Sequence, residues 1–541
     1  MLSCHSDLVL RCSPCHQDSQ TKIPNPSSSF VPLSSPSGST VITRLPFSAE
    51  DAQHKICHVQ KFEPFRAATH VLENEQSMCT LYVTESTPLL SPIRKLPVEL
   101  LGEIFAMHCT RGTGNIIGEK SYCPALQLSQ VCYFWREVML SRTELWGNLE
   151  VRLEQLSGLS LELLRRLLAN SKSSALRLRV TSGYVIAPAG NTTTVAWEAL
   201  VLLLQNSHRW LSATLRLDYQ LFLGASRKIA ETLDGKETLQ QHLPFARLEH
   251  LDVSWFDCRI TSAYNERERI HLFEKAPSLR SLTIPHYDDC FVFPLSRLQE
   301  LNLTNVHRSP APILAQTTNL KHLTVNNFAI RDPGILAHPQ VSHITHLTIQ
   351  VSSYFQSLTL KHLLDHLELP CLTSFSVSEP FHRYTDRQTW SQTAFNSLIR
   401  RSRCQLRKLG VYEILVSGDE LVEILEMCPE LEEFAFFEWQ STCVTKKVLD
   451  GLVLSEESKR RNAPRLSRLA MRIDASMVEG VSRAVESRAD SSFPIEELIL
   501  IDVDVAEDAI DYVALRAHVR GTRVVLKHEP RLLKPVLTAT R

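Results

Sequence analysis

Histidine and cysteine carry most of the metal-binding and nucleophilic chemistry open to this chain, which contains 21 histidines and 14 cysteines. Their densest grouping lies near the start, where Cys12, Cys15 and His16 match the C-x-x-C-H pattern of haem attachment. That chemistry needs export and a surrounding helical haem domain, and the sequence predicts neither. A zinc site that adds Cys4 and His5 lacks a second ligand pair at finger-like spacing. We therefore expect no metal ion and no cofactor, and interpret the grouping as a chance match.

Motifs of enzyme active sites are missing from the sequence. It contains no G-x-x-x-x-G-K-[ST] or G-x-G-x-x-G phosphate loop, no G-x-S-x-G nucleophile elbow and no H-E-x-x-H zinc motif. His322 and His346 fall at equivalent positions of a repeat, but a metal site would also need converging ligands and groups that orient them. We expect no catalytic residue, and predict that the protein is not an enzyme.

A repeated phrase, apolar-x-x-apolar-x-apolar, indicates recognition by a large surface instead. Its copies begin between Leu248 and Ile495 at an irregular spacing of roughly 19 to 35 residues. Each copy is typical of a short strand with period two, and proline often precedes it, as at Pro277 and Pro429. No single unit can bury its apolar side alone, so such units stack into a solenoid with one continuous core.

Period two also selects the side chains that these strands turn toward solvent. The first row comprises His250, Ser281, Glu300, His322, His346, Ser374, Lys408, Glu433 and Arg468. The second row comprises Asp252, Thr283, Asn302, Thr324, Thr348, Ser376, Gly410, Ala435 and Ala470. We expect target binding on this surface, with these candidates: His322, His346, Lys408, Gly410, Glu433, Ala435, Arg468 and Ala470. The small residues late in the second row either form a buried contact with a target or with the C-terminal tail, or merely suit a crowded concave surface.

Further elements are expected around these repeats. Strands are predicted over 147–151, 175–180, 214–217 and 523–526. Helices are predicted over 157–170, 197–211, 419–428, 477–485 and 506–520. The helix over 419–428 is expected to open with a capping box, Ser417-x-x-Glu420. Strand–helix alternation therefore begins soon after residue 146.

Two helices rich in apolar side chains are predicted between Ile93 and Trp146. The first is expected to begin at Pro97, because a first helical turn does not need the missing N–H. Its apolar face has helical spacing: Leu100, Leu101, Ile104, Phe105 and His108. The second is expected to open at Pro124, with this stripe: Leu128, Val131, Cys132 and Trp135. A hairpin of about 50 residues cannot bury so many apolar side chains alone, so a partner is expected.

The same residues resemble the F-box motif, especially in its fungal form. The matching segments are Leu96-Pro97-x-Glu99-Leu100-Leu101-x-x-Ile104-Phe105, Leu126-x-x-Ser129-x-Val131-Cys132-x-x-Trp135-Arg136 and Leu145-Trp146. The resemblance covers about a tenth of the chain, and the long loop from Thr110 to Cys123 departs from it. It implies docking on the SKP-type adaptor of a cullin–RING (SCF) ubiquitin ligase through these residues: Leu96, Pro97, Leu100, Ile104, Phe105, Val131, Cys132, Trp135 and Arg136.

The repeats resemble the leucine-rich repeats that follow many F-boxes. The asparagine or cysteine usual five residues past the second leucine is missing, since other residues stand there: Phe256, Tyr287, Val306 and Phe328. We expect a mixed α+β or α/β fold, with a three-helix F-box before an irregular leucine-rich-repeat-like α/β solenoid. The predicted divisions are a disordered Ser/Pro-rich region (1–90), the F-box (91–147) and the repeats with a C-terminal cap (148–541). A doubly wound α/β domain is the alternative, although the strands are very short and no glycine-rich phosphate loop follows them.

Composition is ordinary for a soluble globular protein, with 43% hydrophobic and 22% charged residues and a formal net charge of −1. That balance gives no support for nucleic acid or a membrane surface as partner, because both reward a basic excess. No apolar run approaches the ~18 residues that a membrane helix needs. The start lacks a basic segment followed by a continuous apolar one, so we expect an intracellular protein, cytoplasmic or nuclear, with reduced cysteines.

These patterns together predict a non-catalytic substrate receptor. The F-box-like hairpin would bind the adaptor, the repeats would hold an unidentified target protein, and partner enzymes would transfer ubiquitin. Two alternatives stay open: an interaction scaffold that uses the hairpin without a ligase and, far below it, an α/β enzyme with an unrecognised site.

Overall fold

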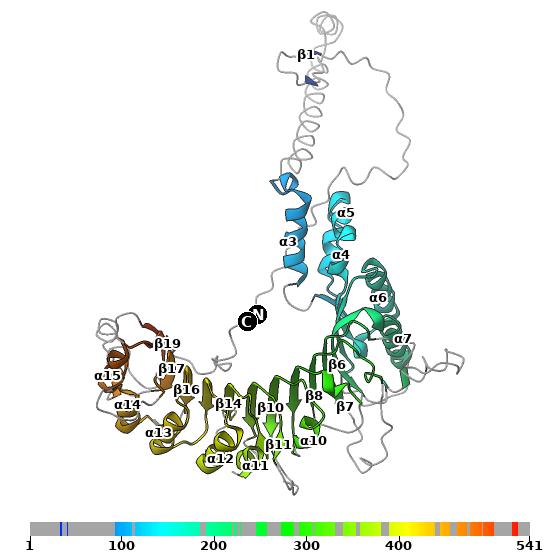
Figure 1. Ribbon diagram of the computed structural model, residues 1–541. Helices are drawn as coiled ribbons and strands as arrows, with labels where there is room; N and C mark the ends of the chain where they lie inside the picture. The colour runs from blue at the N-terminus through cyan, green and yellow to red at the C-terminus, as the bar shows by residue number, and fades with distance from the viewer. Residues whose placement is uncertain are drawn as a thin grey trace, which may run out of the picture. The chain divides into compact units, whose positions relative to one another are not determined.

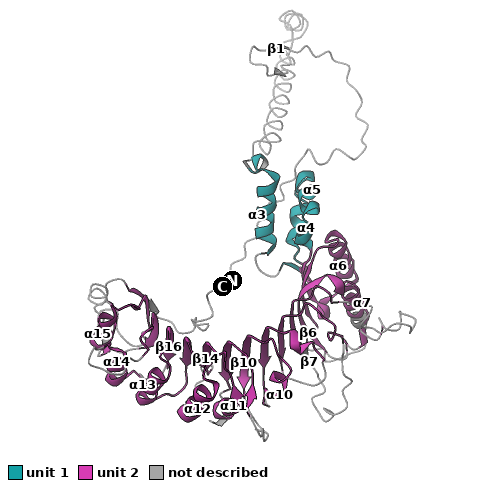
Figure 2. Cartoon of the chain, viewed as in Figure 1, with its two compact units in different colours: residues 1–115, 122–146 teal, residues 116–121, 147–541 magenta. Residues whose placement is uncertain are grey.

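The computed structural model divides the chain into two compact units (Figure 2). The first comprises residues 1–115 and 122–146, and the second residues 116–121 and 147–541. The structure describes residues 33–34, 40–41, 92–110, 114–183, 191–218, 221–222, 224–225, 228, 245–256, 272–285, 292–306, 309–329, 339–352, 358–379, 389–438, 444–454, 463–472, 477–489, 491–501 and 522–527. Apart from the antiparallel pair β1 (Leu33–Ser34) and β2 (Thr40–Val41), the predicted region 1–90 lies outside these residues, as does the predicted helix over 506–520.

The described residues of the first unit form three α-helices: α3 (Val98–Thr110), α4 (Pro124–Ser129) and α5 (Tyr133–Ser141). Short 3-10 turns flank them, η3 (Pro92–Lys95) and η4 (Thr143–Trp146). Pro97 accepts the first helical hydrogen bond of α3, from the amide of Leu101 at 3.0 Å, and Pro124 occupies the first turn of α4. The helix predicted to open at Pro124 is therefore two helices. Its break comes at Cys132, whose Sγ accepts a hydrogen bond from the amide of Trp135 and starts α5.

The core of the first unit forms where α3 meets α5. The Phe105 ring packs against the Trp135 ring with centroids 4.7 Å apart. Trp146 is buried, and its indole N–H donates to the carbonyl of Met139 at 2.8 Å. This bond satisfies the one polar group that burial of an indole would otherwise leave unpaired.

One sheet of 15 strands organises the second unit, and its strands lie side by side in chain order (Figure 1). The strands are β3 (Asn115–Ile117), β4 (Asn148–Arg152), β5 (Leu176–Thr181), β6 (Trp210–Asp218), β7 (His250–Phe256), β8 (Ser281–Pro285), β9 (Glu300–Thr304), β10 (His322–Phe328), β12 (His346–Val351), β14 (Ser374–Ser378), β15 (Lys408–Tyr412), β16 (Glu433–Phe437), β17 (Arg468–Arg472), β18 (Glu497–Ile501) and β19 (Arg523–Lys527). The pairings from β4 to β19 are parallel. Chain order distinguishes this mixed α/β, solenoid-like sheet from a doubly wound one, whose strand order reverses. Each copy of the repeated phrase runs into one of these strands, as predicted.

Helices link the strands and lie along one face of the sheet (Figure 1). They are α6 (Gly158–Asn170), α7 (Asn191–Gln205), α10 (Ala311–Leu314), α11 (Leu358–Asp365), α12 (Gln392–Ser402), α13 (Gly418–Met427), α14 (Lys446–Leu452) and α15 (Val478–Ala489). Shorter links are η5 (Leu153–Gln155), η6 (Ser207–Arg209), η8 (Leu295–Arg297) and the parallel pair β11 (Gln340–Val341) with β13 (Leu367–Glu368). Alternate strand residues such as Leu282, Leu301 and Phe375 are buried on this face. None of the helices in the described ranges is long and apolar enough to cross a membrane.

Local chemistry decides where these helices start and stop. The capping box predicted before α13 is confirmed: the Ser417 hydroxyl accepts from the amide of Glu420, and the Glu420 carboxylate accepts from the amide of Ser417. The predicted helix over 197–211 is wrong at its end, because α7 stops at Gln205. Asn206 donates its side-chain amide to the carbonyl of Leu202, and the chain then turns so that Trp210 begins β6.

A short asparagine ladder exists where the sequence pattern did not place it. Asn305 directly follows β9, and Asn327 is the last but one residue of β10. Both have a left-handed backbone conformation, which asparagine tolerates better than most residues. Their side-chain amides are hydrogen-bonded at 2.5 Å, and Asn326 donates to Asn302 at 2.9 Å. The asparagine ladder that is usual in leucine-rich repeats is therefore displaced here, and in the part of the chain that the structure describes it joins only β9 and β10 and the residue after β9.

Candidate protein-interaction surfaces

Helix α3 divides its apolar residues into two stripes. Leu101, Phe105 and Cys109 recur every four residues and are buried. Leu100, Ile104 and Met107 also recur at helical spacing, yet they are 54%, 41% and 51% exposed. The first stripe builds the core of the first unit, and the second is offered to solvent.

The first unit carries most of the large exposed apolar side chains among the described residues, seven of eleven. Six of them lie on α3 and α5: Val98, Leu100, Ile104, Met107, Tyr133 and Phe134. Single exposed apolar residues are ordinary, but such a concentration on a small unit is typical of a binding surface.

The structure distributes the predicted adaptor-binding residues over the surface and the core. Exposed are Pro97, Leu100, Ile104 and Arg136; half-buried are Leu96, Val131, Cys132 and Trp135. Phe105 is buried against Trp135, so its predicted place on a docking face is wrong: packing against α5 removes it from solvent. The Arg136 guanidinium donates to the carbonyl of Ser129 at 3.1 Å and so closes the end of α4. Sequence reasoning missed Val98, Met107, Tyr133 and Phe134, although the i, i+4, i+7 spacing that ends at Met107 was available as a signal.

The two rows predicted from period two are in register across the sheet. First-row neighbours pair directly, for example His322 with His346 and Lys408 with Glu433, and the row continues to Glu497 and Arg523. The second row likewise continues to Ile499 and Val525. Both rows lie on the same face of the sheet, opposite the face on which the leucines are buried. We call the face with the two rows the helix-free face.

The late part of the first row is a charge ladder, which comprises Lys408, Glu433, Arg468, Glu497 and Arg523. Lys408 Nζ lies 2.7 Å from Glu433 Oε1, and Arg468 Nη1 lies 3.3 Å from the same oxygen. Arg468 also donates from Nε and Nη2 to Glu497 Oε2, at 2.9 and 2.7 Å. Burial alone would lower the pKa of Arg468, but its hydrogen bonds and charge interactions with Glu497 and Glu433 raise it. These predicted target-binding charges are therefore largely satisfied within the sheet.

Period two placed the late part of the second row toward solvent, but the structure buries it, and the surface around its small residues is crowded, which was one of the two explanations offered for them. Gly410, Ala435 and Ala470 lie in an aromatic cluster whose other members are Tyr412, Phe437 and Ile499, with Val525 packed against it. A Cβ at Gly410 would lie 2.6 Å from a ring carbon of Tyr412. Tyr412 and Phe437 stand two residues further along the same strands, on the same face, and cover the small residues. These three residues are accordingly corrected from a target-binding surface to a small core.

The early part of the helix-free face is more accessible. His322 is exposed and stacks on His346 with ring centroids 4.3 Å apart. Burial, the nearby His322 and the charge of Lys408 lower the pKa of His346, and its Nδ1 lies 2.9 Å from Thr345 Oγ1. Burial raises the pKa of Asp252, against the opposing charges of Arg216 and Arg179. No group of three or more potential metal ligands exists among the residues that the structure describes.

Comparison with known proteins does not identify a function for either surface, so the interpretation depends on the residues of this chain. No protein-family model matches the sequence, and no curated protein is measurably similar to it. Among solved structures, a chain from the crystal structure of the Rad7 and Elc1 complex in yeast aligns with 86% of this chain and 98% of its own length. That alignment has 12% sequence identity and a TM-score of 0.27, which is too low for a functional argument.

Proposed function

We propose that this protein is the substrate-recognition subunit of a cullin–RING ubiquitin ligase. Its first unit would act as an F-box and bind a SKP-type adaptor, and its sheet would hold a target protein. The observation that carries the proposal is the exposed stripe of Leu100, Ile104 and Met107 on α3, within a segment that resembles the F-box motif.

The energetics of the stripe favour a partner. Burying a leucine, isoleucine or methionine side chain is worth about 1.5–3 kcal/mol, so the three residues offer a compact source of binding energy. The buried core of a protein–protein interface is more apolar than the rest of the protein surface, and methionine is enriched there. Phe105 and Trp135 support this role indirectly, because their contact holds α3 against α5.

The target would bind the early part of the helix-free face, where the second-row residues Asp252, Thr283, Asn302, Thr324 and Thr348 are half-buried. The late part is occupied by the aromatic cluster and the charge ladder. No chemical step is assigned to this chain. Its contribution would be to raise the effective concentration of the target beside the ligase and to orient it.

The test is a calorimetric titration of the full chain with a purified SKP-type adaptor. Replacing Leu100→Asp and Ile104→Asp is expected to weaken binding at least about tenfold, because both charges would enter the interface. Leu159→Asp is the matched control, since Leu159 is 86% exposed on α6 in the second unit. Both variants should keep the unfolding midpoint of the parent, whereas Phe105→Ala should lower it.

Two results would change the assignment. Equal adaptor binding by the parent and the double variant would remove α3 from the interface. A folded parent chain that does not bind the adaptor at all would favour an interaction scaffold that works without a ligase.

A further inference from the structure

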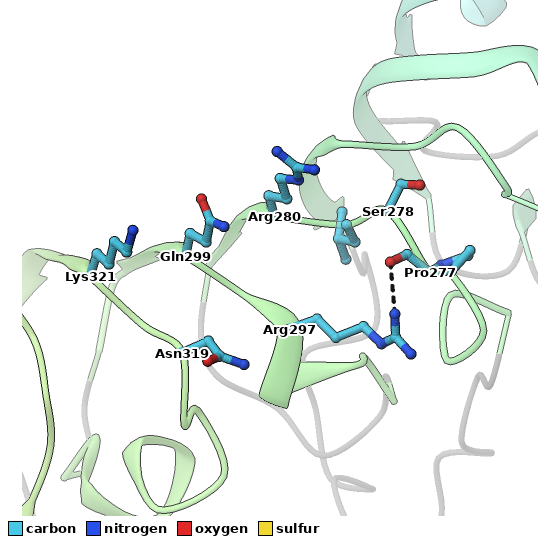
Figure 3. Close-up of a pocket in the computed structure, with 8 residues that line it drawn as sticks. Pro277, Ser278, Arg280, Arg297, Gln299, Asn319 and Lys321 are labelled. Atoms are coloured by element: carbon cyan, nitrogen blue, oxygen red, sulfur yellow. Dashed lines mark hydrogen bonds between the residues drawn. The ribbon is translucent and has the colours of Figure 1, made fainter.

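A shallow groove of about 500 Å³ lies where strands β8, β9 and β10 begin (Figure 3). Arg280, Gln299 and Lys321 each stand one residue before a strand, and their side chains follow one another along this edge of the sheet. Arg297 and Asn319 line the groove from the preceding turns. The groove is separate from the rows of the helix-free face and was not predicted from the sequence.

The backbone fixes the spacing of the three edge residues. The amide of Gln299 donates to the carbonyl of Arg280 at 2.8 Å, and the amide of Lys321 donates to the carbonyl of Gln299 at 2.9 Å. Adjacent strands are about 4.8 Å apart, so Arg280 and Lys321 start about 10 Å from each other. A rigid sheet edge therefore holds two cations at a defined separation, with an amide between them.

The groove is strongly basic. Three of its lining residues are cations, and none is acidic. Arg297 Nη1 donates to the carbonyl of Pro277 at 3.1 Å, which positions its guanidinium without neutralising it (Figure 3). Within the described ranges, no ion pair joins Arg280, Arg297 or Lys321 to a carboxylate, in contrast to the charge ladder of β15–β19.

We propose that this groove binds an acidic peptide segment in an extended conformation, with carboxylates at Arg280 and Lys321 and a polar group at Gln299. An extended chain in the polyproline II conformation has three residues per turn and advances about 3.1 Å per residue, so acidic side chains three residues apart lie on the same side, about 9 Å from each other, and match the separation of the cations. The planar guanidinium of Arg280 can hold a carboxylate through two parallel hydrogen bonds. The lining contains no aromatic ring on which a base could stack, and this favours peptide over single-stranded nucleic acid. This binding does not depend on the adaptor.

Fluorescence anisotropy of the full chain with a labelled peptide tests the proposal. The probe carries aspartates about three residues apart, separated by glycine and serine, and its control carries asparagine at the same places. We expect the aspartate peptide to bind and the asparagine peptide to bind far more weakly. Arg280→Glu with Lys321→Glu should lower the affinity roughly tenfold or more at low salt.

A charge-matched variant separates the groove from the general charge of the chain. Lys361→Glu with Lys446→Glu reverses two exposed cations on α11 and α14 and should leave peptide binding unchanged. Equal losses in both double variants, or no loss in the groove variant, would overturn the proposal. Tighter binding of a single-stranded oligonucleotide than of the peptide would overturn the choice of ligand. The milder Arg280→Gln variant should still weaken binding, and a circular dichroism melt checks that each variant is folded.

Discussion

The early and late halves of the helix-free face share one register but have different environments. In strands β7–β12, second-row residues such as Asp252, Asn302 and Thr348 are half-buried. In strands β15–β17, the same row contains Gly410, Ala435 and Ala470, all of which are buried. Equivalent positions in a repeat therefore do not guarantee equivalent exposure.

The difference in burial comes from the residues that lie two positions further along each strand, on the same face of the sheet. In the early strands these are small or polar, for example Ser254, Thr304 and Gln350. In the late strands they are Tyr412 and Phe437, whose rings cover the second row. The early half is thus available for a target, and the late half stabilises the end of the sheet.

Placing a charge in each half gives the largest expected difference. Ala435→Arg buries a guanidinium in the aromatic cluster and should lower the free energy of unfolding by roughly 3 kcal/mol or more. Thr324→Arg on β10 should change it by about 0.5 kcal/mol or less, because Thr324 is half-buried and its neighbours are polar. Urea denaturation of both variants measures the two values. Equal losses would show that the early half is as closed as the late half.

Filling space in the second row gives an intermediate effect. Gly410→Ala would bring a methyl group to 2.6 Å from the Tyr412 ring and force it to move, at a cost of about 1–3 kcal/mol. Ser376→Ala, at the paired position on β14, should cost less than about 1 kcal/mol. Thermal unfolding of the two variants compares them directly. A Gly410→Ala protein as stable as its parent would show that Tyr412 does not cover this position.

Breaking the charge ladder gives a smaller effect. Arg468→Met leaves the buried Glu433 with Lys408 as its ion-pair partner, and should cost about 1–2 kcal/mol. His322→Gln, in the same row of the early half, should cost about 0.5 kcal/mol or less because His322 is exposed. Urea denaturation at low and high salt measures both. If the Arg468→Met loss matched that of His322→Gln, the ladder would be a surface feature without a stabilising role.

The sequence predicted the strands well because their periodicity reports directly on which side chains are buried. Leu301 and Leu323 lie on paired strands as the repeated phrase required, and the polar residues between them align. The division within α3 could not be predicted from the sequence, since Leu100 and Leu101 are chemically identical and only the packing of α3 against α4 and α5 separates them. The strand β3 inside the predicted loop Thr110–Cys123 was also missed, because a three-residue strand has too few alternations to detect.

The remaining features that the sequence did not predict depend on residues that are far apart in the sequence and adjacent in the sheet. The burial of Ala435 depends on Phe437 of its own strand and on Tyr412 of the neighbouring strand, and no local pattern connects these residues across 25 positions of sequence. The groove at Arg280 and Lys321 has the same origin. Its residues belong to three consecutive repeats, and only the register of the sheet brings them to one edge.

The histidine pair gives the smallest expected effect and reports on solvation of the early half. Burial, then His322, then Lys408 lower the pKa of His346 below its ordinary value of 6.5. The folded state then binds a proton less readily than the unfolded state, so this contribution to stability is full above pH 6.5 and is lost as pH falls below it. Replacing His322→Gln removes one repulsive charge and should raise the pKa of His346, which stays below 6.5 because its burial remains. An NMR titration of the imidazole Cε1 protons measures the pKa of His346 in the parent chain and in the His322→Gln variant. An ordinary pKa for His346 in the parent chain would mean that the early half is more fully solvated than its packing indicates, which would sharpen its contrast with the buried late half.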